Sequence, residues 1–116
     1  MLLIDLTGFA SPSEATDTIN AARQIIATQP RSSVRCIVDV RAARFNTDVV
    51  EALKELAAAN KPYMIATSIV GVSGLQRIIL DAVIKFTGRR NLKAISSFEE
   101  AFAWLAQQQP ESAAAA

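Results

Sequence analysis

Hydrophobic and polar positions follow two alternating periods along this chain. Short runs rich in β-branched and aliphatic side chains, which favour strands, occupy residues 2–7, 34–40, 63–70 and 92–95. Apolar residues recur every three or four positions, as in one face of a helix, over residues 12–28, 47–60, 73–86 and 97–107. Strands and helices that alternate four times predict an α/β domain with right-handed crossovers. We therefore expect a single four-stranded, mainly parallel sheet with four helices packed on it.

Residue types that start helices stand where this pattern requires them. Ser11-Pro12 opens the first helix, and either Asn46 or Thr47 caps the second. No internal repeat and no shift in composition marks a second domain. We therefore predict one domain over residues 1–107 and a flexible tail over residues 108–116.

The composition narrows the classes of function. With 51% hydrophobic and 20% charged residues, the chain has the balance of a globular protein. A net charge of +1 is too small for electrostatic binding of nucleic acid or of a membrane surface. The absence of histidine removes Ser-His and Cys-His nucleophile pairs, and the single Cys36 stands in an apolar run, as a buried small hydrophobic residue would. We expect no enzymatic activity, no metal site and no cofactor.

The chain also lacks the signals that direct proteins into or across membranes. Its first residues contain no basic leader, and no apolar run approaches the roughly 20 residues that cross a bilayer. A cytoplasmic protein without a membrane partner is therefore expected.

Four short motifs are spread over nearly the whole chain. They are Val38-Asp39-Val40 leading into Phe45-Asn46-Thr47, then Asn60-Lys61-Pro62-Tyr63, Val70-Gly71-Val72-Ser73-Gly74-Leu75, and Ser97-Phe98-Glu99-Glu100-Ala101. Together they resemble the STAS-like family, the sporulation anti-sigma-factor antagonist-like domains that are grouped with lipid-binding CRAL-TRIO folds. The resemblance implies a sheet of strand order 2-1-3-4 and a regulatory function in bacterial signalling.

The resemblance also points to one hydroxyl group. In STAS domains, a partner kinase phosphorylates a serine at the start of the helix after the second parallel strand, usually within aspartate-serine-serine/threonine-glycine. The equivalent stretch here is Asn46-Thr47-Asp48-Val49, so Thr47 is the phosphoacceptor equivalent, but the preceding acid and the following glycine are absent. Thr47 alternatively serves only as a helix cap. We predict that its phosphorylation does not control binding.

The loop Gly71-Val72-Ser73-Gly74 is the candidate ligand site. Ligands of open α/β sheets bind at the carboxyl ends of strands where the strand order reverses, which for order 2-1-3-4 lies between the first and third strands. Amides at the start of a helix suit an anion, and Arg77, with Arg41 or Arg44, would supply positive charge. Alternatively, Gly71 and Gly74 only satisfy a tight turn and close packing, and Ser73 caps the helix.

Two acids stand near the ends of the first two strands. Asp5 and Asp39 could form a carboxyl pair for acid–base chemistry. We expect instead that each acid is solvated or bonded to a neighbouring loop amide.

The helix expected over residues 73–86 carries more apolar residues than one buried face needs. Its predicted core stripe consists of Leu75, Ile78, Ile79, Ala82, Val83 and Phe86. Leu80 and Ile84 then fall on roughly the opposite side, which favours a protein contact there. We predict a homodimer through this helix.

Two functions of different classes remain open. The first is a non-enzymatic interaction or regulatory module that acts through protein–protein contacts. The alternative is a module that binds a small anionic molecule or a lipid in the strand-end crevice near Gly71 to Gly74, which requires a cavity.

Overall fold

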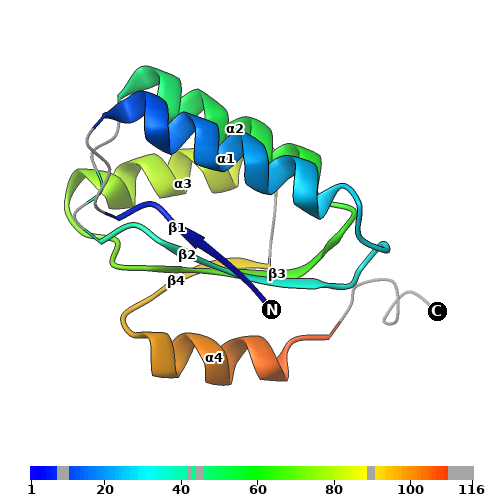
Figure 1. Ribbon diagram of the computed structural model, residues 1–116. Helices are drawn as coiled ribbons and strands as arrows, with labels where there is room; N and C mark the ends of the chain where they lie inside the picture. Colours follow the sequence, from blue (N-terminus) through cyan, green and yellow to red (C-terminus); the bar gives the residue numbers. More distant parts are fainter. Residues whose placement is uncertain (8–10, 42, 44–45, 89–90, 110–116) are drawn as a thin grey trace.

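The computed structural model describes residues 1–7, 11–41, 43, 46–88 and 91–109, and strands alternate with helices throughout (Figure 1). The strands are β1 (Leu2–Asp5), β2 (Val34–Asp39), β3 (Met64–Val70) and β4 (Leu92–Ile95). The helices are α1 (Pro12–Ile26), α2 (Thr47–Asn60), α3 (Leu75–Thr87) and α4 (Phe98–Gln107). Within the described residues, the predicted fold class is confirmed: one four-stranded parallel sheet with four helices. Most of the predicted tail, 110–116, lies outside them.

Local sequence explains where several helices begin and end. α1 starts with a proline directly after Ser11. α4 begins after Ser97, whose hydroxyl accepts a hydrogen bond from the amide of Glu100 at 3.2 Å. α3 stops at Gly88, which adopts a left-handed conformation with φ of +65°.

The predicted strand order is wrong. The strands follow one another as β1-β2-β3-β4 instead of 2-1-3-4, so β1 lies at the edge and pairs with β2 alone. Burial gives the physical reason. In β1, Ile4 is buried while Leu3 and Asp5 are exposed, as expected of an edge strand covered on one face. Residues 34–39 of β2 are almost continuously buried, which requires cover on both faces and a neighbour on each side.

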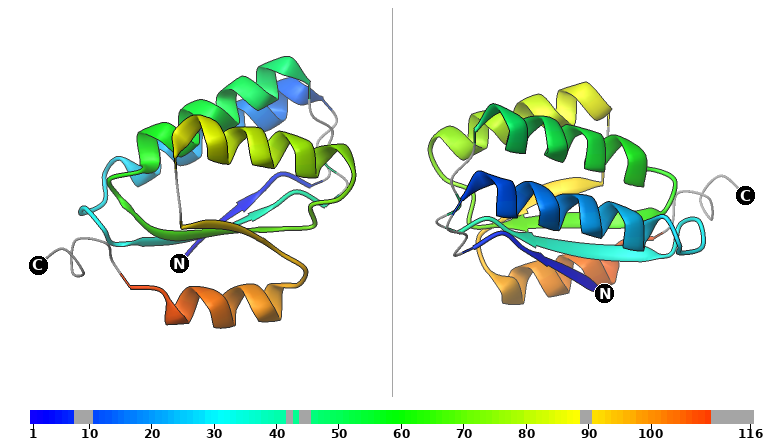
Figure 2. Two further views of the ribbon diagram at one scale, coloured as in Figure 1. Left: turned by 180° about the vertical axis from the view of Figure 1, so that it is seen from behind. Right: turned by 45° about the horizontal axis from the view of Figure 1, so that its top comes forward.

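The helices cover the two faces unequally. Each of the three crossovers joins adjacent strands in the same direction, and right-handed crossovers of this kind place their helices on one face. Figures 1 and 2 show α1, α2 and α3 side by side on that face, with α4 alone on the other. Because the strand order never reverses, the sheet has no switch point of the kind that the ligand prediction assumed.

Buried side chains of the described residues form three clusters. The largest packs α1 and α2 against the sheet, the second lies between α4 and the opposite face, and the third joins α3 to α2 and β4. Cys36 is buried in the first, as predicted. Ser68 on β3 lies between two members of the second cluster, Ala66 and Val70, and its hydroxyl is fully buried without a hydrogen-bond partner among the described residues.

Candidate functional site

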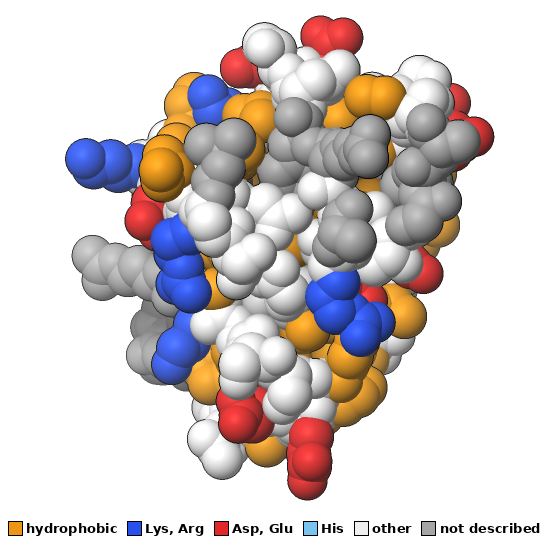
Figure 3. Space-filling model, turned by 90° about the vertical axis from the view of Figure 1, so that its left-hand side faces the viewer, with side chains coloured by type: hydrophobic (Ala, Val, Ile, Leu, Met, Phe, Trp, Pro, Cys, Tyr) orange, Lys and Arg blue, Asp and Glu red, His pale blue; other side chains and the backbone are white. Residues whose placement is uncertain are grey.

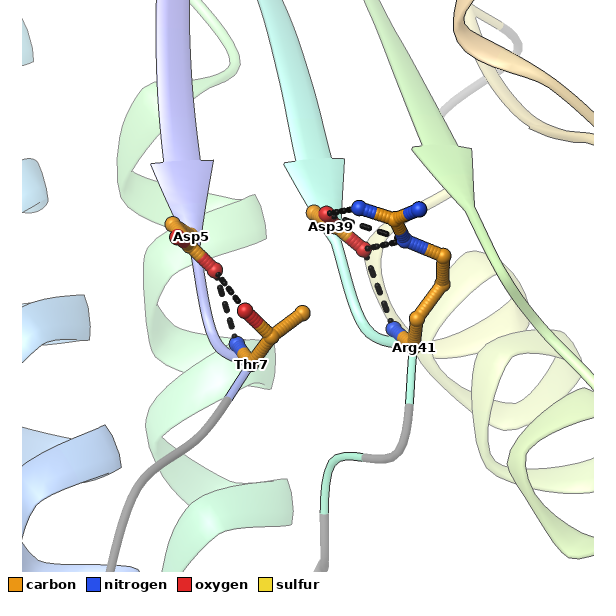
Figure 4. Close-up of polar contacts among 4 residues, drawn as sticks. All are labelled: Asp5, Thr7, Asp39 and Arg41. Carbon is orange, nitrogen blue, oxygen red and sulfur yellow. Dashed lines mark hydrogen bonds and ion pairs between the residues drawn. The ribbon is translucent and has the colours of Figure 1, made fainter.

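The carboxyl edge of the sheet brings together the ends of β1 and β2. Asp5 and Asp39 are register partners on these neighbouring strands (Figure 4). An Asp5 Oδ1 accepts the amide of Thr7 at 2.8 Å and its hydroxyl at 2.6 Å. Asp39 Oδ1 accepts the amide of Arg41 at 3.1 Å. The expectation that each acid bonds to a neighbouring loop amide is therefore confirmed, and both acids fix how the chain leaves the sheet.

Arg41 neutralises the buried acid of the pair. Its Nη2 donates to Asp39 Oδ2 at 2.8 Å and its Nε to Oδ1 at 3.0 Å, so the contact is bidentate. The Asp39 side chain is 5% exposed and that of Arg41 60% exposed. The guanidinium carbon also lies 5.1 Å from the ring centroid of Phe98, which ties the end of β2 to the start of α4.

These contacts shift two pKa values. Hydrogen bonds from Thr7, the hydroxyl first and the amide second, lower the pKa of Asp5, and the charge of Arg41 contributes a smaller effect of the same sign. The hydrogen bond to Asp39, followed by its negative charge, raises the pKa of Arg41. Both shifts favour the charged forms of these two side chains.

Gly71 lets β3 approach Arg41 closely. A Cβ atom at Gly71 would lie 2.2 Å from Arg41 Cγ, 2.9 Å from its backbone nitrogen and 3.0 Å from its Cα. Gly71 also has φ of +90°, in the region that favours glycine. Close packing thus accounts for this glycine, as the alternative to a ligand site anticipated.

Hydrogen bonds from the Gln76 side chain connect α3 to the chain that follows β2, a role that sequence analysis missed. Its side-chain Nε2 donates to the carbonyls of Val40 at 3.1 Å and Ala43 at 3.0 Å. Its Oε1 accepts the amide of Ser73 at 3.3 Å. The spacing of Ser73 and Gln76 could have indicated this role. Near the start of a helix, a glutamine three residues after a serine often bonds through its side chain to the backbone amide of that serine.

The predicted anion site is only partly assembled. Ser73 does not cap α3; Gly74 holds the cap position without a side-chain bond, and Gln76 engages the Ser73 amide. Arg77 is exposed, and Arg44 lies outside the described residues. Figure 3 views the side at which the strands end; among the described residues on this face, the Lys and Arg side chains are divided between separate places, with uncharged atoms between them.

The question of which residue caps α2 is settled. The Asn46 side chain accepts the amide of Val49 at 2.9 Å, and Thr47 is the first residue of the helix. The alternative that Thr47 is the cap is therefore wrong. Thr47 is exposed, and Asp48 follows it in the first turn.

An apolar cavity of about 60 Å³ lies between α2, α3 and the sheet. Its walls include Leu53, Ile79 and Leu80, with Thr67 and Gln76 among the few polar side chains. For comparison, an apolar cavity that binds benzene measures about 150 Å³. The space is therefore too small for an acyl chain in this conformation.

The apolar residues of α3 are divided differently from the prediction. Leu80 is 7% exposed and packs with Val83 in the third cluster, and Ile84 is half-buried against it. Ile78 and Phe86, placed in the core by the predicted stripe, are each 66% exposed. The proposed interface residues Leu80 and Ile84 therefore belong to the core side, because the buried face is rotated around the helix.

The exposed apolar residues of α3 form a line along its outer side, which we call the α3 ridge: Ile78, Ala82 and Phe86. They are four residues apart, so they stand one above another on the helix surface. Lys54 of α2 places its Nζ 5.5 Å from the Phe86 ring centroid, which holds the ring against the helix layer.

No protein-family model, curated protein or solved structure matches the chain. Within the described residues, no helix combines the length and the apolar character that a bilayer crossing requires. The same part of the chain holds no group of three or more His, Cys, Asp or Glu side chains placed to bind a metal ion.

Proposed function

We propose that this protein is a cytoplasmic, non-enzymatic interaction module that acts in bacterial signalling through protein–protein contacts. The signalling context comes from the STAS-like resemblance of the sequence motifs. The α3 ridge is the observation that carries the proposal of an interaction surface. Its two large residues, Ile78 and Phe86, are each two-thirds exposed on one helix face, and apolar side chains gathered on one face are typical of contact sites.

The residues at the carboxyl edge of the sheet support a non-enzymatic function. Its acids are engaged by Thr7 and Arg41, and its glycine turn packs on Arg41, so the groups that would serve catalysis are used in holding the fold. The alternative, a small-molecule or lipid-binding module at Gly71 to Gly74, has less support because the apolar cavity measures about 60 Å³.

Site-specific photo-crosslinking in living cells tests the proposal. A photoreactive phenylalanine analogue replaces Phe86 in one variant and Phe102 in another, and adducts are identified by mass spectrometry. Phe102 is the matched control, because it is also a half-exposed phenylalanine on a helix but lies on the opposite face of the sheet. We expect protein adducts from position 86 in clear excess over position 102.

One combination of results would replace the proposed interaction module with the ligand-binding alternative. If position 86 captures no protein above the control, and native mass spectrometry finds a monomer that carries a small molecule, the ligand-binding alternative replaces this proposal.

A further inference from the structure

The outer side of α3 carries opposite charges next to its apolar ridge. Asp81 and Lys85 are exposed and one turn apart, and neither has an ion-pair partner within the described residues. On a helix, both side chains lie on the same flank of the ridge, at positions along the helix axis between Ile78 and Phe86. Figure 2 (left) shows α3 in front of its layer in the view from behind, with no described element over its outer side.

This arrangement is self-complementary when two copies of α3 run in opposite directions. A two-fold axis that is perpendicular to both helices and passes between the two Ala82 residues sets Ile78 of each copy opposite Phe86 of the other, so the contact occurs twice. The same rotation places Asp81 near Lys85 of the second copy on the shared flank. Ala82 meets its own equivalent at the crossing, where a small side chain lets helices approach to the usual interaxial distance of about 8–10 Å.

We infer that a second copy of this chain binds the α3 ridge, with the two α3 helices antiparallel about an axis at Ala82. The inference rests on the proposed function, since it names the partner of that same surface. A parallel pair is disfavoured, because its two-fold axis would turn the flank that carries Asp81 and Lys85 toward the opposite flank of the second copy, so that the two charges would not pair. The residues differ from the sequence-based homodimer prediction, which used Leu80 and Ile84.

The size of the surface sets the expected affinity. One helix face on each side buries less than the roughly 1,200 Å² of total area found at the lower limit of stable complexes. The dimer is therefore weak and reversible, and it is measured by sedimentation equilibrium at protein concentrations up to about 1 mM.

Removal of the aromatic ring tests the surface. We expect Phe86→Ala to weaken dimerisation about tenfold or more, as truncation of a central aromatic residue does at interfaces. Phe102→Ala, on the opposite face of the sheet, leaves the dimerisation constant unchanged. Both sites are exposed, and far-UV circular dichroism confirms that each variant is folded.

Charge reversal tests the antiparallel register. Asp81→Lys alone gives a chain with two positive residues at the contact, and Lys85→Asp alone gives a chain with two negative residues. Each should dimerise less than the wild type, whereas an equimolar mixture should form a heterodimer through two restored ion pairs. The double variant Asp81→Lys with Lys85→Asp should again form a homodimer.

Three results overturn the inference. One is a wild type that stays monomeric over the whole concentration range, and another is equal weakening by Phe86→Ala and Phe102→Ala. The third is failure of the two charge-reversed chains to associate preferentially with each other. Crosslinks from position 86 to other proteins, with a monomeric wild type, would retain the proposed function while removing self-association.

Discussion

The close approach of Gly71 to Arg41 makes Gly71→Ala the most informative single substitution in this fold. The added Cβ would lie 2.9 Å from the backbone nitrogen of Arg41 and 3.0 Å from its Cα, as well as 2.2 Å from Cγ. The side chain of Arg41 can move, but its backbone nitrogen is held by a hydrogen bond to Asp39. The clash therefore cannot be relieved by a rotamer change alone.

The expected cost has two parts. A non-glycine residue at φ of +90° costs about 1–2 kcal/mol, and insertion of a methyl group into a tightly packed contact costs about 1–3 kcal/mol. A gain of about 0.4–1 kcal/mol from the stiffer unfolded chain offsets some of this. We expect a net loss of about 2–4 kcal/mol in the free energy of unfolding.

Gly88→Ala is the matched control. Gly88 also has a positive φ, +65°, but nothing lies within 4 Å of the position its Cβ would take. Only the backbone term applies there, so the expected loss is about 1 kcal/mol or less. Urea unfolding monitored by circular dichroism measures both, and the difference corresponds to a midpoint shift on the order of 1 M.

A second comparison isolates the contact itself. Arg41→Ala removes Cγ but leaves the backbone atoms near Gly71, and it also deprives the buried Asp39 of its ion-pair partner. The loss that Gly71→Ala adds in the Arg41→Ala background should therefore be smaller than in the wild type, but not zero. Equal destabilisation by Gly71→Ala and Gly88→Ala, within about 0.5 kcal/mol, would refute the close-packing argument.

Three further predictions follow from hydrogen bonds. Ser68→Ala should leave stability unchanged or raise it by up to about 1 kcal/mol, because the lost hydroxyl is buried without a partner among the described residues; a loss above 1 kcal/mol in urea unfolding would contradict this. Asn46→Ala should cost about 1 kcal/mol through loss of the α2 cap, whereas Thr47→Ala changes the unfolding midpoint little; the reverse order would contradict the assigned cap. Thr7→Val should raise the pKa of Asp5 toward its ordinary value in carboxyl-carbon NMR titrations. Since the native pKa is lowered, the stability from this acid is present above its unfolded pKa and is lost as the pH falls through the folded one; an unchanged titration would exclude the Thr7 hydroxyl bond as its main cause.

The order and extent of the elements were predictable because their signals are local. Residues 92–95 form β4 as expected, and α2 starts at Thr47 after an asparagine cap. The wrong strand order, 2-1-3-4, was taken from the STAS-like resemblance, and the burial pattern offered no check on it, because the apolar Leu3 concealed the one-sided burial of β1. Because apolar and polar residues do not alternate in β1, nothing in the sequence identified it as the edge strand.

The rotation of α3 was not predictable for a similar reason. Apolar residues occupy so many of its positions that the stripe through Ile78 and Phe86 and the stripe through Leu80 and Val83 are both consistent with a buried face. Long-range bonds from Gln76 to the carbonyls of Val40 and Ala43 decide between them. Such contacts leave no periodic trace in the sequence, so the candidate interface residues were assigned to the wrong side.

The unbroken order β1-β2-β3-β4 bears on how the chain acquires this shape. Each strand after β1 forms hydrogen bonds with the strand that precedes it along the chain, so no strand has to insert between two that are already paired. The cluster that packs α1 and α2 on the sheet is composed almost wholly of residues before β3, with Met64 as its last member. The pairs formed at each step, such as Leu2 with Cys36 and Thr67 with Leu92, span one strand–helix–strand unit, so no step has to close a longer loop. As the ribosome releases the chain, the sheet can therefore grow from its β1 edge one strand at a time.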